Sequence, residues 1–334
     1  MTQGSDAAVP DRPQRRPWRA FGFDEFGILL ALALFFIVGA VSSPYFLTVN
    51  NLTGILQNIT FLGFLSIGVG LTLMAGEIDI SVGSVFGLTA VATALVLRSG
   101  YPVVAAIAAG LLVGLGCGLL NGLIAQVIRV PVVVVTLATL GIYRAVALAL
   151  ANGSPVGGLP ASPAFFDGFG QGGIGQVSYI TILFLIVAAG AEFVLRWTST
   201  GFRVLAVGSN PLAAHLVGFH VGRTRVLLLA FSGLVAGLSG VSAVAYLHTA
   251  GPTAGTGYEL SVLAATIIGG VRLTGGRGSI LGVLLGLGVI GIFQNLIVLW
   301  GISPNWTQGV SGLVLVAAMT LTWLTKGEAR AAAA

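Results

Sequence analysis

Charged residues are almost absent from long stretches of this chain, and this limits what the chain can fold into. Between Gly27 and Leu97 the only charged residues are Glu77 and Asp79. Of all 334 residues, 7% are charged and 56% are hydrophobic, whereas soluble domains carry about 25% charged residues. Because so few charges cannot cover a surface that faces water, the sequence predicts an all-α polytopic membrane protein.

Ten apolar stretches approach the roughly 20 residues that a helix needs to cross a bilayer. A helix is expected for each, because a helix satisfies its backbone polar groups within the segment. The third and eighth stretches are expected to be broken or re-entrant helices, since one begins in a polar sequence and the other is short. The expected spans are 27–47, 52–75, 81–98, 102–127, 132–150, 178–196, 224–247, 258–271, 279–300 and 305–325.

Arginine and lysine in the connections predict the orientation, because cytosolic loops are enriched in both. With ten spans, most of these residues fall on one side of the membrane if both termini are cytosolic. The same bias explains the excess of 15 Lys and Arg over 10 Asp and Glu, so no nucleic acid partner is expected. The expected parts are a basic cytosolic tail at 1–26, a single transmembrane domain at 27–326 with an external loop at 151–177 and a cytosolic segment at 198–222, and a cytosolic tail at 327–334. Topology is the favoured explanation of the basic tail, and contact with anionic membrane lipid stays open as a second role.

The stretch "GEIDISVGS", residues 76–84, places two carboxylates inside an apolar region. Residues two apart point about 200° apart on a helix, so the carboxylates do not share a helical face. We expect one helix to break at Gly76 and another to begin near Ile80, with Asp79 or Ser81 as its N-cap. A role for one carboxylate on the transport path or in ion coupling stays open. The candidate residues of this break and of a possible gate are Gly76, Glu77, Asp79, Ser81, Gly83 and Ser84.

The cytosolic segment carries the signals of a short helix. Asn210 is a good N-cap, Pro211 suits the first helical position and Gly218 is a good stop, which predicts a helix at about 211–217. A turn between two spans needs only a handful of residues, so a helix here indicates a docking surface. For the external loop, three readings stay open: a cap on the pore, a contact with an external partner and a passive linker.

Glycines recur at every fourth position on two of the expected spans. Small residues at this spacing let helix backbones approach closely in a membrane. We expect tight packing within one subunit for most of them, while a subunit interface or a moving contact stays open. The residues are Gly110, Gly114, Gly118 and Gly122 in the fourth span and Gly278, Gly282 and Gly286 in the ninth.

Several kinds of chemistry are missing from the sequence. Lys326 is the only lysine, so the chain contains no G-x-x-x-x-G-K-[ST] phosphate-binding loop. The three histidines lack metal-ligand spacing, and Cys117 is the only cysteine. We therefore expect no catalytic, cofactor or metal site and no enzyme activity in this chain. An ion-driven carrier would have to depend on Glu77 and Asp79.

Four segments resemble one family of transport proteins, the permease subunits of ribose/xylose-type bacterial ABC sugar importers. "AGEIDISVGSVFGLTA" is similar to that family's G-G-I-D-L-S-V-G-S segment. "GLLNGLIAQVIRVPVVVVTLATLGIYRAVAL" contains its N-G-L-I and V-P-x-x-x-x-T-L-x-T-L-G patterns. "TGFRVLAVGSNPLAAHLVGFHV" resembles its cytosolic G-x-N-x-x-A-A segment, and "LSVLAATIIGGVRLTGGRGSILGVLLG" its C-terminal glycine-rich segment. The four segments follow one another in the same order as in that family, and together they cover most of Ala75 to Gly291.

The resemblance implies a pore-forming subunit in a bacterial inner membrane, importing a monosaccharide or similar small neutral polar solute by alternating access. Its implied partners are a second permease copy or paralogue, two cytosolic ABC ATPase subunits or one tandem ATPase, and an external solute-binding protein. Glu77 departs from the family's usual glycine, and Phe219 from its frequent isoleucine. The residues expected to couple to the ATPase are Gly201, Gly208, Asn210, Pro211, Ala213, Ala214 and Gly218.

Two alternatives to a sugar importer stay open from the sequence. One is a branched-chain amino-acid-type ABC permease, whose fold is related. The other is a stand-alone ion-coupled carrier that uses Glu77 and Asp79.

Overall fold

A computed structural model describes residues 23–162, 164–303, 306, 308, 309, 311–313, 315, 316 and 320. Helices make up most of these residues, as the apolar runs predict. The elements are α1 (Phe23–Ser42), α2 (Val49–Met74), α3 (Val82–Arg98), α4 (Val103–Ile128), α5 (Val132–Leu150), the short π-helix η1 (Ala164–Gly170), β1 (Gly173–Ile174), β2 (Val177–Ser178), α6 (Tyr179–Trp197), α7 (Ser199–Ser209), α8 (Pro211–Leu216), α9 (Val221–Leu247), α10 (Tyr258–Ile268) and α11 (Ile280–Leu299).

Six of the described helices are long and apolar enough to cross a bilayer, namely α2, α4, α5, α6, α9 and α11. The third and eighth predicted spans correspond to α3 and α10, which are among the shorter apolar helices. At about 1.5 Å per residue, the 11 residues of α10 reach only part of the way across. The tenth predicted span and both predicted tails lie mostly or wholly outside the described residues.

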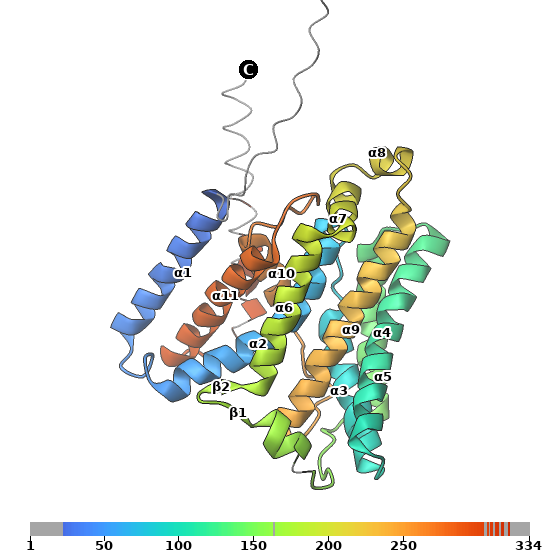
Figure 1. Ribbon diagram of the computed structural model, residues 1–334. Coiled ribbons are helices and arrows are strands. Elements are labelled where there is room, and N and C mark those ends of the chain that lie inside the picture. Colours follow the sequence, from blue (N-terminus) through green and yellow to red (C-terminus); the bar gives the residue numbers. More distant parts are fainter. Residues whose placement is uncertain are drawn as a thin grey trace, which may run out of the picture.

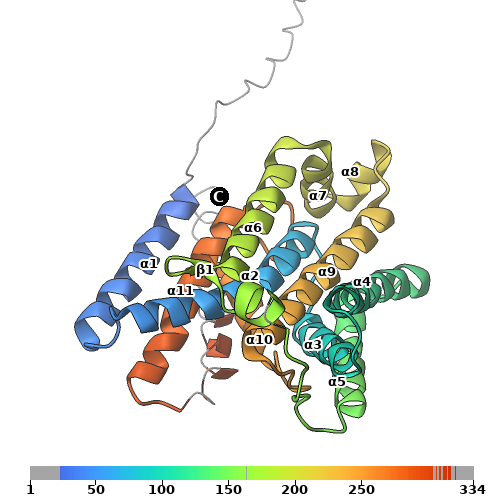
Figure 2. The same ribbon diagram turned by 60° about the horizontal axis from the view of Figure 1, so that its bottom comes forward.

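Helix α2 lies at the centre of the molecule, with α1 and α11 toward one edge and α9, α4 and α5 toward the other (Figures 1 and 2). Helices α2, α3 and α9 are mostly buried, whereas about a third or less of the apolar part of α4, α5 and α6 is buried. Apolar helix surface that the subunit leaves uncovered in a membrane protein faces lipid or another subunit. The bundle therefore has a buried centre that includes α2, α3 and α9, with α4, α5 and α6 around it.

The two ends of the bundle differ in the elements that they carry (Figure 1). One end holds α7 and α8, and we call it the α8 end. The opposite end holds the antiparallel hairpin of β1 and β2, in which Ile174 pairs with Val177, and we call it the hairpin end. At the hairpin end η1 packs against the last turn of α9, where the rings of Phe166 and His248 lie 4.5 Å apart.

Glycines of α4 form a close seam with α9. A Cβ atom on Gly114 would lie 2.4 Å from the carbonyl oxygen of Gly233, and one on Gly118 would lie 2.1 Å from that of Leu229. Both distances are too short for any side chain, so the two backbones are in direct contact. A Cβ atom on Gly110 would lie 2.6 Å from the Val241 side chain, and one on Gly122 would lie 2.8 Å from Cα of Val226, both on α9.

The second glycine series differs from the sequence-based expectation at one position. Gly282 and Gly286 lie in α11 and touch the backbone of α10, against Gly269 and Ala265. Gly278 does not belong to this helix, because Ser279 is the N-cap and its side chain accepts a hydrogen bond from the Gly282 amide. With φ of 154°, Gly278 belongs instead to the connection before α11.

Candidate coupling site

Helix α2 ends where the sequence predicts a break. Gly76 has φ of 82°, a left-handed conformation that glycine adopts without steric cost. The Gly76 amide donates to the Leu73 carbonyl and the Glu77 amide donates to the Thr72 carbonyl, each at 2.9 Å. This pair of bonds is the Schellman motif, which satisfies the last carbonyls of a helix. The break therefore follows from local sequence.

Helix α3 starts near the predicted place, and Ser81, one of the two predicted caps, stands in the N-cap position without forming the expected side-chain bond. The helix begins at Val82 with Ser81 in the N-cap position, and no side-chain capping bond is formed. The Ser81 hydroxyl instead donates to Asp79 at 2.7 Å, and the Ser81 amide donates to the same oxygen at 3.0 Å. Asp79 thus closes a turn before the helix and does not cap its first amides.

Asp79 also belongs to a buried polar network that no local sequence pattern predicts. The Ser232 hydroxyl of α9 donates to its second carboxylate oxygen at 2.8 Å. Asn121 of α4 donates to the Ser81 hydroxyl at 2.9 Å, and the Tyr143 hydroxyl of α5 donates to Asn121 at 3.0 Å. Three helices, α4, α5 and α9, are therefore tied to the turn between α2 and α3, which makes that turn a fixed point in the bundle.

Glu77 lies at the α8 end and pairs with an arginine. Its carboxylate is 2.8 Å from Nε of Arg225 on α9. Burial raises the pKa of Glu77, while the Arg225 charge and the backbone N–H of Val132 oppose that rise. The carboxylate therefore connects the break to the first turns of α9 and α5. The sequence alone left its role open, since Arg225 is distant in the chain.

The short helix in the predicted cytosolic segment is confirmed. The Asn210 side chain accepts a hydrogen bond from the Ala213 amide at 3.0 Å, Pro211 is the first helical residue, and Gly218 has φ of 91° beyond the end. Sequence analysis missed the helix α7 that precedes it. Its signal was Thr198 as an N-cap, followed by an apolar stripe at Gly201, Val204, Val207 and Gly208, all of which are buried.

Three glycine-containing segments meet where α7 ends, and we call their meeting point the glycine junction (Gly76, Gly208, Gly275 and Gly276). A Cβ atom on Gly208 would lie 1.9 Å from the Met74 carbonyl oxygen, and one on Gly275 would lie 2.8 Å from Cα of Gly76. The Gly276 amide donates to the Met74 carbonyl at 2.8 Å. The end of α7 therefore touches, backbone to backbone, both the end of α2 and the connection from α10 to α11.

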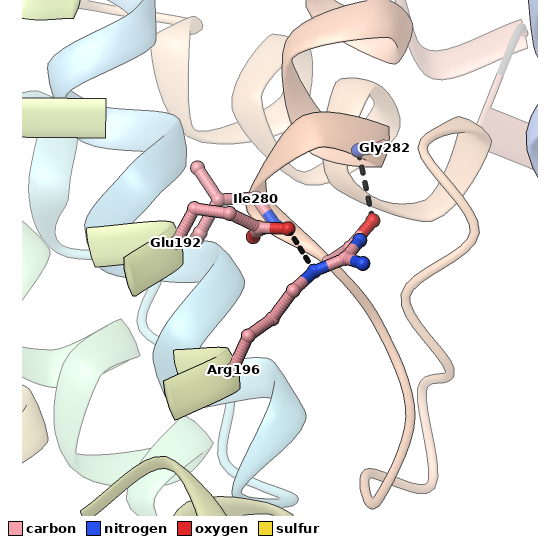
Figure 3. Close-up of polar contacts among 5 residues, drawn as sticks. Glu192, Arg196, Ile280 and Gly282 are labelled. Atoms are coloured by element: carbon pink, nitrogen blue, oxygen red, sulfur yellow. Dashed lines mark hydrogen bonds and ion pairs between the residues drawn. The ribbon is translucent and has the colours of Figure 1, made fainter. Parts of the chain in front are cut away.

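A second link ties the end of α6, just before α7, to α11 (Figure 3). On α6, Glu192 forms an ion pair with Arg196, as their four-residue spacing predicts. The other oxygen of Glu192 accepts a hydrogen bond from the Ile280 amide at 2.7 Å, in the first turn of α11. A carboxylate is favourable at a helix N-terminus because it meets unpaired amides and the positive end of the dipole.

Apolar side chains are exposed on and beside α8. Leu212 is 70% exposed, Leu216 78% and Val217 71%, and Phe202 on α7 is also exposed. Ala214 is the buried residue of α8. Helix α8 follows directly on the end of α7, which touches the end of α2 and the α10–α11 connection backbone to backbone. A force applied to the apolar outer face of α8 can therefore be transmitted through α7 to these two segments.

Comparison with known proteins identifies the family. A family described as "Branched-chain amino acid transport system / permease component" matches residues 51–319, which is most of the chain. The chain belongs to this family. It is therefore a multi-pass membrane protein and the permease component of a transport system. The four segments that resemble sugar-importer permeases all lie inside the matched range.

Individual relatives carry the names of importer permeases for sugars and a signalling molecule. The ribose import permease protein RbsC of Escherichia coli K12 is 34% identical over 293 residues, covering 87% of this chain and 91% of the relative. The L-arabinose ABC transporter permease protein AraH of Azospirillum brasilense is 32% identical and covers 98% and 95%. The autoinducer 2 import system permease protein LsrC of E. coli K12 is 32% identical and covers 88% and 85%.

A solved structure shares the fold. It is described as an inward-facing conformation of a metal-chelate type ABC transporter, and its TM-score against this chain is 0.50. The alignment covers 90% of this chain and 98% of the other at 14% identity. At so low an identity the likeness shows the fold alone, which is the fold of an ABC transporter's membrane subunit.

Proposed function

We propose that this chain is the pore-forming permease of an ATP-driven importer in a bacterial inner membrane, and that it takes up a monosaccharide or a similarly small neutral polar solute. The observation that carries the proposal is the exposed apolar face of α8, joined through the glycine junction to the ends of α2 and α10. The names of the relatives support the solute class, since ribose and arabinose are both sugars.

The proposed mechanism is alternating access driven from the α8 end. Two ABC ATPase subunits, or one tandem ATPase, bind the α8 faces of two permeases, and the second permease is a copy or a paralogue. When ATP draws the ATPase halves together, α7 and α8 move, and the glycine junction passes that motion to α2 and to the α10–α11 connection. The external solute-binding protein delivers solute at the hairpin end.

The two alternatives have less support. The family description names branched-chain amino acids, yet the relatives reported above carry the names of sugar and autoinducer 2 permeases. An ion-coupled carrier would need a carboxylate free to bind an ion. Asp79 already accepts three hydrogen bonds and Glu77 already faces an arginine, so both carboxylates have structural partners.

Co-purification of the ATPase tests the proposal. The permease is expressed with its ATPase and solute-binding protein, and the variants Leu212→Glu and Leu216→Glu place a charge on the apolar face of α8. We expect the ABC ATPase to be lost from the purified complex, because a buried unpaired carboxylate weakens an interface. The matched control is Ile174→Glu, since Ile174 is 70% exposed at the hairpin end. If both α8 variants retain the ATPase as the control does, the assignment of α8 is wrong.

A further inference from the structure

A polar cavity lies between α2, α10 and α11, away from the glycine junction. Its volume is about 630 Å³ and it opens to the surface of the chain. Pockets for small molecules measure about 300–1,000 Å³, so the cavity has room for a monosaccharide and several waters. It reaches α2 in the first three turns, at Gly54, Ile55 and Asn58, and therefore lies in the half of the bundle toward the hairpin end.

Neutral hydrogen-bonding groups line the cavity. The polar side chains are those of Asn58, Thr256, Tyr258, Ser261, Gln294, Asn295 and Gln308, and no charged side chain is among the described lining residues. Carboxamides both donate and accept hydrogen bonds, and hydroxyl groups do the same. Such a lining matches the hydroxyl groups of a sugar, which likewise donate and accept.

Some of these groups are already ordered by their neighbours. Nε2 of Gln294 donates to the Ser261 hydroxyl at 3.0 Å, which fixes the direction of the Gln294 side chain. Asn295 exchanges hydrogen bonds with Asn51 of α2, at 2.7 and 3.1 Å. A lining that is held in place before the ligand arrives loses less conformational entropy on binding.

Other groups have hydrogen-bonding capacity to spare. Within the described part of the chain, the Asn58 side chain and the Tyr258 hydroxyl form no hydrogen bond, and the Gln294 carbonyl accepts none. Polar groups left unpaired against lipid are costly, because lipid offers no hydrogen bonds. The open side of the cavity therefore faces water or the partner permease, and the unpaired groups are available to a solute.

We propose that this cavity is the solute-binding station of the permease, and that Asn58, Tyr258 and Gln294 contact the hydroxyl groups of a neutral sugar as it passes. This rests on the proposed import function and adds the site and the ligand chemistry. A zwitterionic amino acid fits less well, since its ammonium and carboxylate groups would lose water without meeting a charged partner. In the assembled importer, the second permease closes the open side.

Transport assays in proteoliposomes test the contacts. The permease, its ATPase and its binding protein are reconstituted together, and uptake of labelled D-ribose and L-arabinose is measured with ATP hydrolysis, with L-leucine as a competitor. We expect Asn58→Ala and Gln294→Ala to lower the sugar moved per ATP about three- to tenfold, the range for losing a hydrogen bond or two. We expect the binding protein still to stimulate ATP hydrolysis in both variants. We also expect that leucine does not compete with sugar uptake.

The matched control is Asn50→Ala, which removes the same group from an exposed position of α2 outside the cavity. Its sugar-to-ATP ratio is expected to equal that of the wild type. If the cavity variants also match the wild type, the cavity is not the solute-binding station, although the proposed import function still holds. If the wild-type complex hydrolyses ATP and moves leucine but neither sugar, both the proposed substrate class and the sugar station are wrong.

Cysteine labelling tests the cavity without any substrate. Cys117 is the only cysteine, so Asn58→Cys and Gln294→Cys in a Cys117→Ala background each carry one thiol. We expect both to react with a charged, water-soluble thiosulfonate, and the binding protein loaded with the transported sugar to slow that reaction. Leu112→Cys, at a position 65% exposed on the apolar surface of α4, should react only with a lipid-soluble maleimide. If Asn58→Cys behaves like Leu112→Cys, the cavity is filled by lipid and the proposal fails.

Discussion

Glu77 and Asp79 are two residues apart, and the structure gives them different surroundings. Asp79 is buried and accepts three hydrogen bonds, two from Ser81 and one from Ser232. Glu77 is partly exposed and faces Arg225 across 2.8 Å. One carboxylate thus orders a buried turn through neutral donors, and the other joins two helices through charge.

The Glu77–Arg225 pair makes a prediction about stability. We expect Glu77→Gln to lower the free energy of unfolding by about 1–3 kcal/mol, between the values for exposed and buried ion pairs. Arg225→Gln alone should cost a similar amount, because each single variant leaves one charge unpaired. The double variant should cost less than the sum, because it leaves no unpaired charge. Denaturant titration of the purified permease measures all three.

Uptake by the Glu77→Gln variant bears on the ion-coupled alternative. In the complete complex we expect uptake to remain dependent on ATP and independent of sodium and proton gradients. Abolished uptake in a complex that still assembles and hydrolyses ATP would instead favour a direct role of the carboxylate in transport.

Gly208 makes the closest backbone contact of the glycine junction. We expect Gly208→Ala to lower the free energy of unfolding by about 1–3 kcal/mol, as overpacking does, because its Cβ would lie 1.9 Å from the Met74 carbonyl oxygen. Gly190→Ala on α6 is the matched control, since nothing lies within 4 Å of its added Cβ. The control should be neutral or slightly stabilising, given alanine's higher helix propensity. Equal melting temperatures for the two variants would contradict the close contact.

Among the helices, α4 and α9 have the seam that tolerates least change. Gly116 and Gly118 are two residues apart on α4, yet an added Cβ on Gly116 has nothing within 4 Å, whereas one on Gly118 lies 2.1 Å from the Leu229 carbonyl oxygen. We expect Gly118→Ala to destabilise the permease by about 1–3 kcal/mol and Gly116→Ala to leave it unchanged. Thermal unfolding in detergent compares the pair, and an equal loss of stability in both variants would contradict the close contact at Gly118, since alanine has the higher helix propensity at both positions.

Elements whose signals are local were predictable from the sequence. Helix α8 is defined by three residues that lie close together in the chain, Asn210, Pro211 and Gly218. Helix α2 ends at Gly76 through hydrogen bonds within a stretch of six residues. Hydropathy located the long helices for the same reason, because each satisfies its own backbone. Helix α7 was missed because its buried stripe is short and lies in a segment read as a connection.

Contacts between distant parts of the chain were not predictable in this way. Ser232 is 153 residues from Asp79, and Arg225 is almost as far along the chain from its partner Glu77 at the break. The glycine junction joins positions near 76, 208 and 275, each of which reads locally as an ordinary turn. For the same reason, the sequence placed Ser81 correctly at the N-cap of α3 but not its hydroxyl, which bonds to Asp79 and to Asn121 from another helix and forms no capping bond.

Across the whole molecule, the arginines are divided unequally between the two ends. The order of the helices places seven of the described arginines at or near the α8 end, while Arg98 lies toward the hairpin end and Arg144 donates to two carbonyls inside the bundle. Cytosolic loops carry such an excess. The seven are Arg129, Arg196, Arg203, Arg223, Arg225, Arg272 and Arg277.

This asymmetry predicts that the α8 end is cytosolic and the hairpin end external. Thr200 on α7 and Gln176 on the hairpin are both exposed, so Thr200→Cys and Gln176→Cys in the Cys117→Ala background report one end each. In intact spheroplasts we expect a membrane-impermeant maleimide to label Gln176→Cys only, and in inside-out vesicles Thr200→Cys only. Labelling of both in spheroplasts before lysis would show leaky membranes, which a cytosolic marker enzyme detects. The reverse pattern would invert the topology, and with it the surfaces assigned to the ATPase and to the solute-binding protein.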